Sequence, residues 1–273
     1  MDKIRLDQAL FARGLTRSRE QARALIMEGK VLVNGIRAEK AGQPVREEDS
    51  LSVRDETVPF VSRGGLKLEK AVEIFPISLS GCVCADIGAS TGGFTDCILK
   101  HGGAVVYAID VGYGQLDWSL RQDSRVRVME RTNARFMEPG WFETPLDFAS
   151  IDVAFISLDK ILPALFPCLR EGGETVALIK PQFEAGRGKI GKHGVVSDPA
   201  VHREVIGKVW DMAGETGFTV AGLDFSPIRG PKGNIEFLLF LKKISDAGTR
   251  SSAVPKTCIH DVVEQARSTC ISD

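Results

Sequence analysis

From residue 83 onward, apolar residues recur as short runs separated by stretches with helical periodicity. Such runs, alternating with helices, are typical of strands buried on both faces of a parallel sheet. Five strands are expected, at 83–87, 104–110, 126–130, 151–156 and 175–179. Two more, at 218–225 and 235–241, flank the turn-rich segment 227–234 and predict a terminal hairpin. The pattern predicts an α/β fold of the Rossmann type with a mostly parallel seven-stranded sheet.

The first sixty residues follow a different pattern. Two short helices are expected within 5–28, because apolar residues there recur every three or four positions. Strands are expected at 31–33, 36–38 and 51–53. The pair Asn34-Gly35 is a favoured two-residue hairpin turn between the first two of these strands. These elements predict a small α+β domain.

The 273-residue chain is long enough for two domains. We expect the small domain over residues 1–57, a linker over 58–61 around Pro59, and the α/β domain over 62–244. Residues 245–273 begin with SDAGTRSSAVP, which is typical of a linker, and continue with a short helical pattern. No function is predicted for this tail.

Composition narrows the class of protein. Hydrophobic residues make up 43% and charged residues 26%, as in ordinary globular proteins. The chain has no apolar run near the roughly 20 residues of a membrane span and no signal-like N-terminus, which predicts a cytoplasmic protein without membrane partners. The six cysteines lack C-x-x-C spacings, so free thiols and no metal site are expected. The net charge of −1 predicts no global attraction to nucleic acid.

Five arginines lie close together near the N-terminus, against only two acids, Asp7 and Glu20. They are Arg5, Arg13, Arg17, Arg19 and Arg23. Because the guanidinium fork suits phosphate, the cluster is a candidate contact for an RNA backbone. On charge alone, a solvated helix face is the better explanation.

The order of elements favours the RNA interpretation. The runs R-L-D-x-x-L and S-R-x-x-A-x-x-L-I-x-x-G-x-V-x-V-N-G resemble the alpha-L RNA-binding module of a small-subunit ribosomal protein, pseudouridine synthases and tyrosyl-tRNA synthetases. The resemblance covers about residues 3–54. It implies a module that docks on structured RNA.

A glycine-rich turn follows the first strand of the α/β domain. Residues 86–94 read D-I-G-A-S-T-G-G-F, in which glycines allow a ligand close to the backbone. The candidate cofactor contacts here are Asp86, Gly88, Ser90, Gly92, Gly93 and Phe94. The run is not G-x-G-x-x-G, and a plain helix-entry loop is the alternative.

Two polar residues after the next strands support a nucleoside-type cofactor. Asp110 ends the second strand, where an acid can accept hydrogen bonds from ribose hydroxyls, although helix caps also use such acids. Asn133 follows the third strand and is a candidate contact for an adenine edge, or a turn residue. With Asp86 before the glycines, these spacings favour S-adenosylmethionine over a dinucleotide.

Methyl transfer needs a positioned nucleophile and removal of its proton, so the remaining motifs discriminate among target atoms. After the fourth strand the run D-V-A-F-I-S differs from the N-P-P-Y type of amine methylation. After the fifth strand the run K-P-Q-F has no cysteine for covalent attack on a pyrimidine. Base methylation is therefore disfavoured.

Two lysines are candidates for work on a ribose hydroxyl. Lys67 lies in a predicted helix, and Lys180 directly follows the buried run 177–179 at the sheet edge where α/β active sites form. A partly buried lysine near another cation loses proton affinity and can act as a base. Asp152 and Glu236 are candidates to orient it. Taken singly, each of these charges fits a surface residue or ion-pair partner better, except Lys180, which leaves a buried strand.

A longer set of motifs resembles one family. The stretches are SRGGLKL, DIGASTGGFTDCIL, AIDVGYGQLDWSLR, ERTNAR, FISL and KPQFEAGRGKIGKHGVVSDP. They resemble the TlyA family, whose catalytic domain is similar to FtsJ-type rRNA methyltransferases, over about residues 3–243. The resemblance implies 2′-O-methylation of cytidine in ribosomal RNA by a tetrad of Lys67, Asp152, Lys180 and Glu236. It implies that the second lysine deprotonates or orients the hydroxyl, and Lys70, one turn after Lys67, competes for the first position.

A further basic segment and two other functions stay open. Arg187, Lys189 and Lys192 predict a basic loop that closes over RNA, or a disordered solvated loop. TlyA-family members have also been labelled haemolysins, and a non-catalytic ribosome-assembly factor is a third class. The target nucleotide, the ribosomal subunit and the oligomeric state do not follow from the residues.

Overall fold

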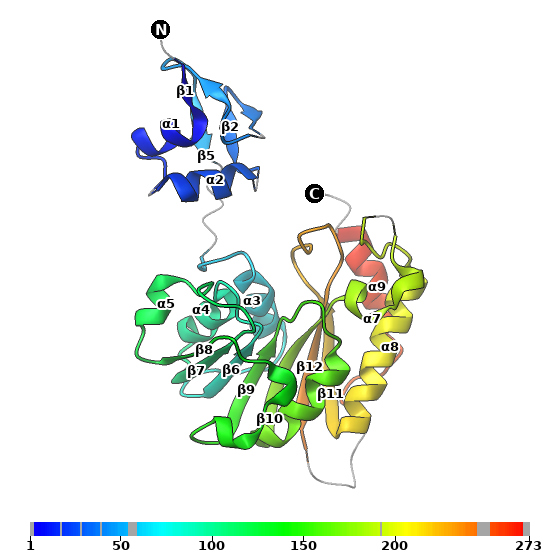
Figure 1. Ribbon diagram of the computed structural model, residues 1–273. Helices are drawn as coiled ribbons and strands as arrows, with labels where there is room; N and C mark the ends of the chain where they lie inside the picture. Colours follow the sequence, from blue (N-terminus) through cyan, green and yellow to red (C-terminus); the bar gives the residue numbers. More distant parts are fainter. Residues whose placement is uncertain are drawn as a thin grey trace. The chain divides into compact units, whose positions relative to one another are not determined.

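The computed structural model describes residues 3–16, 18–27, 29–38, 40–53, 59–191, 193–244 and 252–269. The chain forms two compact units, Met1–Val58 and Pro59–Asp273 (Figure 1). Residues 59–61, expected in the linker, lie in the second unit. There Phe60 is buried and the Val61 amide donates to Asp96 Oδ2 at 2.8 Å.

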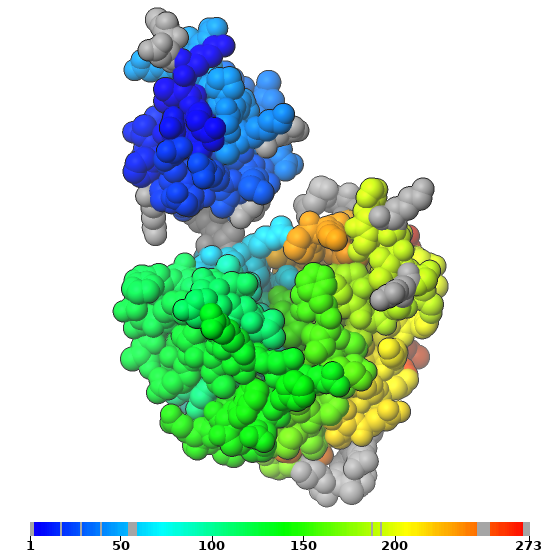
Figure 2. Space-filling model, viewed as in Figure 1, coloured from blue at the N-terminus to red at the C-terminus, as the bar shows by residue number. Residues whose placement is uncertain are grey.

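The N-terminal unit folds around two helices and a small sheet, as predicted. Its elements are β1 (Ile4–Arg5), α1 (Leu6–Ala12), α2 (Arg19–Met27), β2 (Val31–Val33), β3 (Ile36–Arg37), β4 (Pro44–Val45) and β5 (Leu51–Val53). Asn34 and Gly35 have φ values of 51° and 79°, which a two-residue hairpin between β2 and β3 requires. The pairing of β1 with β4 was not predicted, because two-residue strands carry no periodicity. This unit (blue in Figure 2) has its own hydrophobic core, which includes Leu6, Leu10 and Ile26.

The second unit is built on a seven-stranded sheet in the order β11-β12-β10-β9-β6-β7-β8. The strands are β6 (Val83–Ile87), β7 (Val105–Ile109), β8 (Val126–Met129), β9 (Leu146–Ile151), β10 (Leu169–Ile179), β11 (Phe218–Phe225) and β12 (Phe237–Lys243). β12 pairs antiparallel with both β10 and β11, whereas the pairs from β10 to β8 are parallel. The predicted fold class and terminal hairpin are confirmed.

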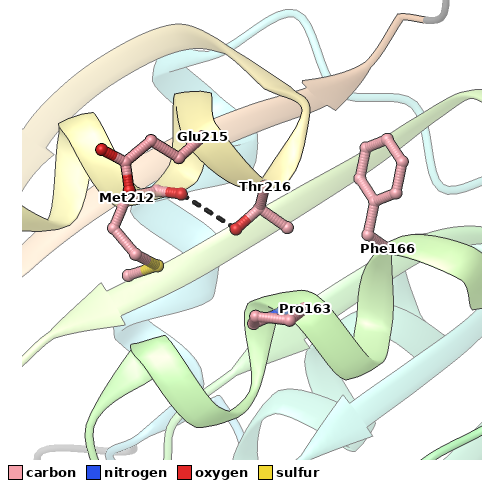
Figure 3. Close-up of a pocket in the computed structure, with 5 residues that line it drawn as sticks. All are labelled: Pro163, Phe166, Met212, Glu215 and Thr216. Carbon is pink, nitrogen blue, oxygen red and sulfur yellow. Dashed lines mark hydrogen bonds between the residues drawn. The ribbon is translucent and has the colours of Figure 1, made fainter.

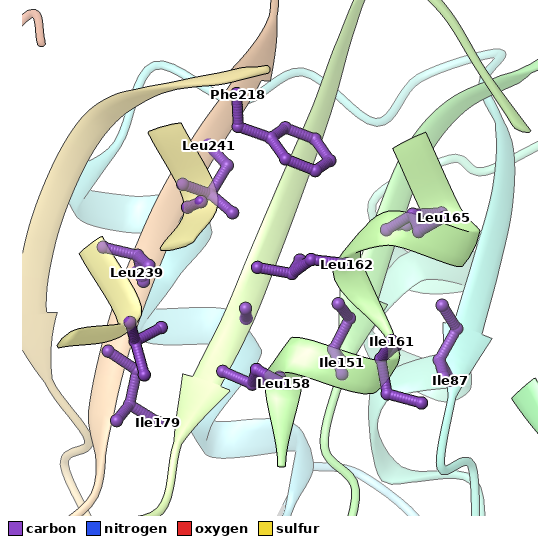
Figure 4. Close-up of a cluster of buried hydrophobic side chains, with 14 of the residues drawn as sticks. Ile87, Ile151, Leu158, Ile161, Leu162, Leu165, Ile179, Phe218, Leu239 and Leu241 are labelled. Atoms are coloured by element: carbon purple, nitrogen blue, oxygen red, sulfur yellow. The ribbon is translucent and has the colours of Figure 1, made fainter. Parts of the chain in front are cut away.

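Helices cover this sheet. They are α3 (Gly65–Ile74), α4 (Gly93–Lys100), α5 (Trp118–Gln122), α6 (Leu162–Leu165), α7 (Pro181–Glu184), α8 (Pro199–Thr216) and α9 (Cys258–Thr269). Short 3-10 turns are η1 (Ala134–Phe136), η2 (Pro139–Trp141), η3 (Leu158–Lys160), η4 (Phe166–Cys168) and η5 (Arg187–Lys189). Figure 4 shows how strand residues such as Ile87 and Ile151 pack with Leu162 of α6 in the core.

The C-terminal helix belongs to the same core. Four apolar residues of α9 are buried, at the helical spacing seen in the sequence: Ile259, Val262, Val263 and Ala266. α9 contacts α8 and β11. The end of the chain therefore adds to the hydrophobic core of the second unit.

The position of the fourth strand was predicted wrongly. The strand covers Leu146–Ile151, five residues before the expected run 151–156. Residues 153–156 are apolar, but they form a loop that borders a cavity instead of pairing in the sheet. Asp152 consequently follows the strand directly.

The sequence predicted neither a membrane-spanning helix nor paired cysteines. Among the described residues, no helix is long and apolar enough to cross a membrane. The five cysteines in that part of the chain are free thiols, as predicted: Cys82, Cys84, Cys97, Cys168 and Cys258.

Candidate active site

Four charged side chains from distant parts of the chain meet at one end of the sheet. Lys67 comes from α3, Asp152 from the end of β9, Lys180 from the end of β10, and Glu236 directly precedes β12. Lys67 Nζ lies 2.7 Å from Glu236 Oε2 and 3.3 Å from Asp152 Oδ2. Lys180 Nζ lies 2.5 Å from Asp152 Oδ1. The structure thus brings the four expected catalytic residues together.

The four charged side chains are largely buried. The side chains of Lys67, Asp152, Lys180 and Glu236 are 9%, 18%, 12% and 1% exposed. Burial lowers the pKa of Lys67, but Asp152 and Glu236 outweigh it and raise that pKa above its ordinary value. Burial raises the pKa of Asp152, but Lys67 and Lys180 outweigh it and lower that pKa. Asp152 is therefore the carboxylate that holds both ammonium groups.

Lys70 is excluded from this cluster by its direction on α3. Its Nζ donates to Asp224 Oδ1 at 2.9 Å and to the Phe225 carbonyl at 2.7 Å. It also lies 3.6 Å from the centre of the Phe225 ring. Lys70 lies one helical turn beyond Lys67 on α3, and its amine is held by β11, so Lys67 is the one of the two that contacts Asp152.

A cavity of about 430 Å³ adjoins the tetrad, and Asp152 is part of its wall. This volume suits a ligand of nucleoside size. Gly88, Ser90, Asp110 and Asn133 line it, as expected for cofactor contacts. Gln115, Thr132 and Phe155 also line it and were not predicted, because nothing in their local sequence marks them.

The glycine turn is held tightly against the end of β9. Gly88 has φ 87°, and a Cβ there would lie 2.6 Å from the Asp152 carbonyl oxygen. Asp110 fixes the turn from the other side, since its Oδ2 accepts from the Ser90 amide at 2.8 Å and its Oδ1 from the Gly112 amide at 2.7 Å. Each carboxylate oxygen keeps a second lone pair for a ligand hydroxyl.

The other expected cofactor residues lie under the turn instead of on the cavity wall. Asp86 is fully buried and accepts from the Thr95 amide at 2.9 Å and the Thr95 hydroxyl at 2.7 Å. Gly92, Gly93 and Phe94 are likewise buried. A Cβ at Gly93 would lie 2.8 Å from the Gly65 amide nitrogen, so this glycine allows α4 to approach α3. These residues shape the turn.

Burial raises the pKa of Asp86 to about 7, with Asp152 adding to the effect. Because the folded-state pKa exceeds the unfolded value near 4, the contribution of Asp86 to the unfolding free energy should be complete below about pH 4 and be lost as pH rises through about 7. The loss is at most about 4 kcal/mol. Asp86→Asn should flatten this dependence, because an amide does not ionise. The variant should still fold, because the amide oxygen can accept from Thr95. Urea unfolding followed by tryptophan fluorescence between about pH 5 and pH 8 measures it.

All three tryptophans, Trp118, Trp141 and Trp210, lie in the second unit, so the fluorescence reports on that unit alone. Asp117→Asn is the matched control, because Asp117 is an exposed helix cap and asparagine caps equally well. Equal pH slopes in wild type and Asp86→Asn would contradict the assigned ionisation.

Phe155 stands out beside the tetrad. It is 91% exposed and has φ 64°, an unfavourable backbone conformation for a bulky residue. Its ring lies 5.1 Å from that of Phe183, centre to centre. Glu184 holds the same loop by accepting from the Ser157 hydroxyl at 2.6 Å and the Leu158 amide at 2.8 Å. Strain of this kind concentrates at functional sites.

Comparison with known proteins identifies the family of each part of the chain. Residues 60–243 match the FtsJ-like methyltransferase family, and residues 4–51 match the S4 domain. The 16S/23S rRNA (cytidine-2′-O)-methyltransferase TlyA of Mycobacterium tuberculosis is 43% identical over 264 residues, covering 96% of this chain and 98% of that protein. The chain belongs to the TlyA family of FtsJ-like methyltransferases.

Two further TlyA-family relatives span nearly the whole chain. A Bacillus subtilis protein provisionally named an rRNA methyltransferase is 48% identical over 268 residues, 98% of this chain and 95% of its own. The solved structure of a Streptococcus thermophilus protein, provisionally named a hemolysin, is 48% identical with a TM-score of 0.79 and covers 98% of this chain and 97% of its own. The relatives thus include proteins named rRNA methyltransferase and a protein named hemolysin.

In the S4 domain of this TlyA-family chain, three of the expected RNA-binding arginines converge on one acid. Asp7 is fully buried, with Arg5 and Arg23 at 3.0 Å and Arg19 at 3.5 Å. The hydrogen bond from Arg5 is the main cause that lowers the pKa of Asp7, against the effect of burial. The three arginine side chains are 40–49% exposed, so this ion-pair cluster lies at the surface of the domain.

Arg13 has a different role in the S4 domain. Its guanidinium donates to the backbone carbonyls of Asp49 at 2.7 Å and of Arg46 and Glu47 at 2.9 Å, so it braces the loop before β5. Arg17 lies outside the described residues. RNA contact by these arginines stays a prediction.

The predicted basic loop is only partly described. Lys189 forms an ion pair with Glu204 of α8. Lys192 and the side chain of Arg187 lie outside what the structure describes. Closure of this loop over RNA also stays a prediction.

A second depression in the surface differs in chemistry from the active-site cavity. It is shallow and is lined by Pro163, Phe166, Met212, Glu215 and Thr216 (Figure 3). The Thr216 hydroxyl donates a hydrogen bond to the Met212 carbonyl at 2.9 Å. Its lining contains neither a lysine nor a glycine turn, so it offers no groups for methyl transfer.

Proposed function

We propose that this protein transfers a methyl group from S-adenosylmethionine to the 2′-hydroxyl of a cytidine in ribosomal RNA. One observation carries the proposal: Lys180 pairs with Asp152, and Asp152 forms part of the wall of a cavity lined by Gly88 and Asp110. A proton-handling lysine is thereby next to a nucleoside-sized site. The name of the Mycobacterium tuberculosis relative gives the same target atom.

The cavity residues fit S-adenosylmethionine. Gly88 leaves its wall free of a side chain, and the free lone pairs of Asp110 suit ribose hydroxyls. The Asn133 side chain lines the cavity and accepts from the Arg135 amide at 3.1 Å, which leaves its NH₂ group for an adenine ring nitrogen. We assign cofactor binding to these residues.

Bound S-adenosylmethionine supplies an electrophilic methyl group on a sulfonium. Lys180 is positioned to orient the ribose 2′-hydroxyl and to take up its proton. Asp152 holds Lys180 and Lys67 in place, because it is the only tetrad carboxylate that contacts both. Glu236 anchors Lys67 from the other side. Catalysis then rests on positioning and proton removal.

The S4 domain would dock on rRNA or ribosomal subunits, which places the enzyme with ribosomes in the cytoplasm. The test is transfer of radiolabelled methyl groups from S-adenosylmethionine to isolated subunits. A 2′-O-methyl group removes the hydroxyl that attacks the chain in alkali, so the modified position should resist alkaline hydrolysis. Label on a base would contradict the proposal, and binding without label would favour an assembly factor. Lysis of erythrocytes without methylation would favour a haemolysin.

Phe155 should stack on the base of the target nucleotide, because it is an exposed aromatic ring next to Asp152 and RNA bases stack on such rings. Phe155→Ala should raise the Michaelis constant for rRNA or lower turnover by about 5- to 100-fold, which corresponds to about 1–3 kcal/mol of stacking. Cofactor affinity should change by a few-fold at most, because the proposed cofactor contacts are Gly88, Asp110 and Asn133. Phe136→Ala, which removes another exposed phenyl ring, is the control. Equal losses in both variants would dismiss a specific role for Phe155.

A further inference from the structure

Three side chains with metal-binding atoms converge between α3 and α4, apart from the tetrad. Glu69 lies on α3, Cys97 lies on α4, and His101 ends α4. Glu69 Oε2 accepts from Cys97 Sγ at 3.4 Å and lies 2.7 Å from His101 Nε2. The three ligand atoms all lie within 4.8 Å of one another.

This arrangement has the chemistry and spacing of a transition-metal site. Cys97 and His101 are four residues apart on one helix, so both side chains leave the same face. Thiolate, imidazole and carboxylate are ligands of zinc, and in a tetrahedral site their atoms lie roughly 3.3–3.7 Å apart. Small side-chain rotations would bring the three atoms to that spacing.

The three side chains differ in burial. Cys97 is buried, whereas the side chains of Glu69 and His101 are 31% and 33% exposed. A metal ion would therefore enter from the side of Glu69 and His101, and a water molecule would complete the tetrahedron.

We propose that Glu69, Cys97 and His101 bind one Zn²⁺ ion at the α3–α4 contact. On binding, the Cys97 thiol releases its proton to solvent, and His101 carries its ring proton on Nδ1 so that Nε2 binds the metal. Glu69 contributes a carboxylate oxygen. The ion takes the place of the hydrogen that Cys97 Sγ now donates to Glu69 Oε2.

The proposed ion would connect two elements of the active site. Glu69 lies two residues after Lys67 on α3, and α4 begins at Gly93 of the glycine turn. Bridging these helices would stabilise the second unit and hold Lys67 relative to the cofactor cavity. The ion itself contacts neither Lys67 nor the cavity, so its role is to position these elements.

The experiment is a titration of the metal-free, reduced full-length chain with Co²⁺, which reports tetrahedral thiolate sites by its absorption, followed by competition with Zn²⁺. One equivalent should bind, with a sulfur-to-cobalt charge-transfer band. Cys97→Ser should abolish that band, and His101→Ala should weaken binding by more than the roughly 10- to 100-fold that removing an outer-shell partner costs.

Two matched variants serve as controls for this titration. Cys82→Ser and His260→Ala change a cysteine and a histidine elsewhere in the second unit and should leave the band and the affinity unchanged. Zn²⁺ should raise the melting temperature of wild type and of both controls, but not of Cys97→Ser.

Circular dichroism of metal-free proteins shows whether Cys97→Ser and His101→Ala fold. If either does not, Glu69→Gln replaces it, because it keeps the shape of the side chain but removes its charge. Absence of the charge-transfer band in wild type, its persistence in Cys97→Ser, or an unchanged Co²⁺ affinity in His101→Ala or Glu69→Gln would overturn the proposed site.

Discussion

Lys180→Ala should lower methyl transfer to rRNA by about 10²–10⁴-fold, the usual contribution of a positioned acid–base group. Affinity for S-adenosylmethionine should stay within a few-fold, because the proposed cofactor contacts are Gly88, Asp110 and Asn133. The fold should survive, since Asp152 keeps its ion pair with Lys67. Single-turnover methylation and calorimetric titration with the cofactor measure the two effects separately.

Lys180→Arg separates the two possible roles of this lysine. Arginine keeps a positive charge and hydrogen-bond donors but does not give up its proton. If Lys180 acts as the base, Lys180→Arg should be as inactive as Lys180→Ala, whereas a role in orientation alone predicts partial activity. Lys242→Ala, which removes a lysine paired with Glu174 at 2.8 Å, is the control. Wild-type turnover of Lys180→Ala would remove this residue from the mechanism.

A chain that begins at Pro59 should keep its cofactor affinity but show a kcat/KM for ribosomal subunits that is lower by about 10²–10⁴-fold. The reason is that a tethered docking module raises the effective concentration of substrate by about that factor. Starting at Pro59 retains Phe60 and the bond from Val61 to Asp96, which a later start would remove. The effect is measured as the rate of subunit methylation, and the cofactor affinity of the same protein serves as the reference. Full activity of the shortened chain would refute the docking role.

Substitutions around Asp7 test the arginines in the full-length chain. Arg19→Gln with Arg23→Gln should weaken binding to rRNA and flatten its salt dependence, by about 0.7–0.9 in log–log slope for each phosphate group that is no longer neutralised. Asp7→Asn has the opposite charge effect, because it keeps the guanidinium groups and removes their acid. It should therefore bind rRNA at least as tightly.

Asp7→Asn also removes the acid at the centre of a partly exposed ion-pair cluster, which we expect to destabilise the S4 domain by about 1–3 kcal/mol. Circular dichroism must show that this domain is still folded before binding is compared. Parallel weakening of RNA binding by both sets of substitutions, with folded domains, would mean that the arginines serve the fold and not the RNA.

Local patterns in the sequence predicted most of the secondary structure. β6 begins and ends where its apolar run does, and the Asn34-Gly35 hairpin follows from the turn preference of two neighbouring residues. The fourth strand was misplaced because an apolar run indicates burial or ligand contact equally well. At 153–156 the run borders a cavity, and the paired strand is the mixed segment before it.

Which residues meet was decided by the tertiary structure. The sequence by itself determined the alternating strands, the glycine turn and the hairpins, because these depend on neighbours a few residues apart. Only the folded chain selected Lys67 over Lys70, buried Asp86 beneath the turn and joined three arginines to Asp7. It alone brought Glu69 to Cys97 and His101. The physical reason is that side-chain direction and burial depend on how helices and strands pack, which involves residues far apart in the sequence.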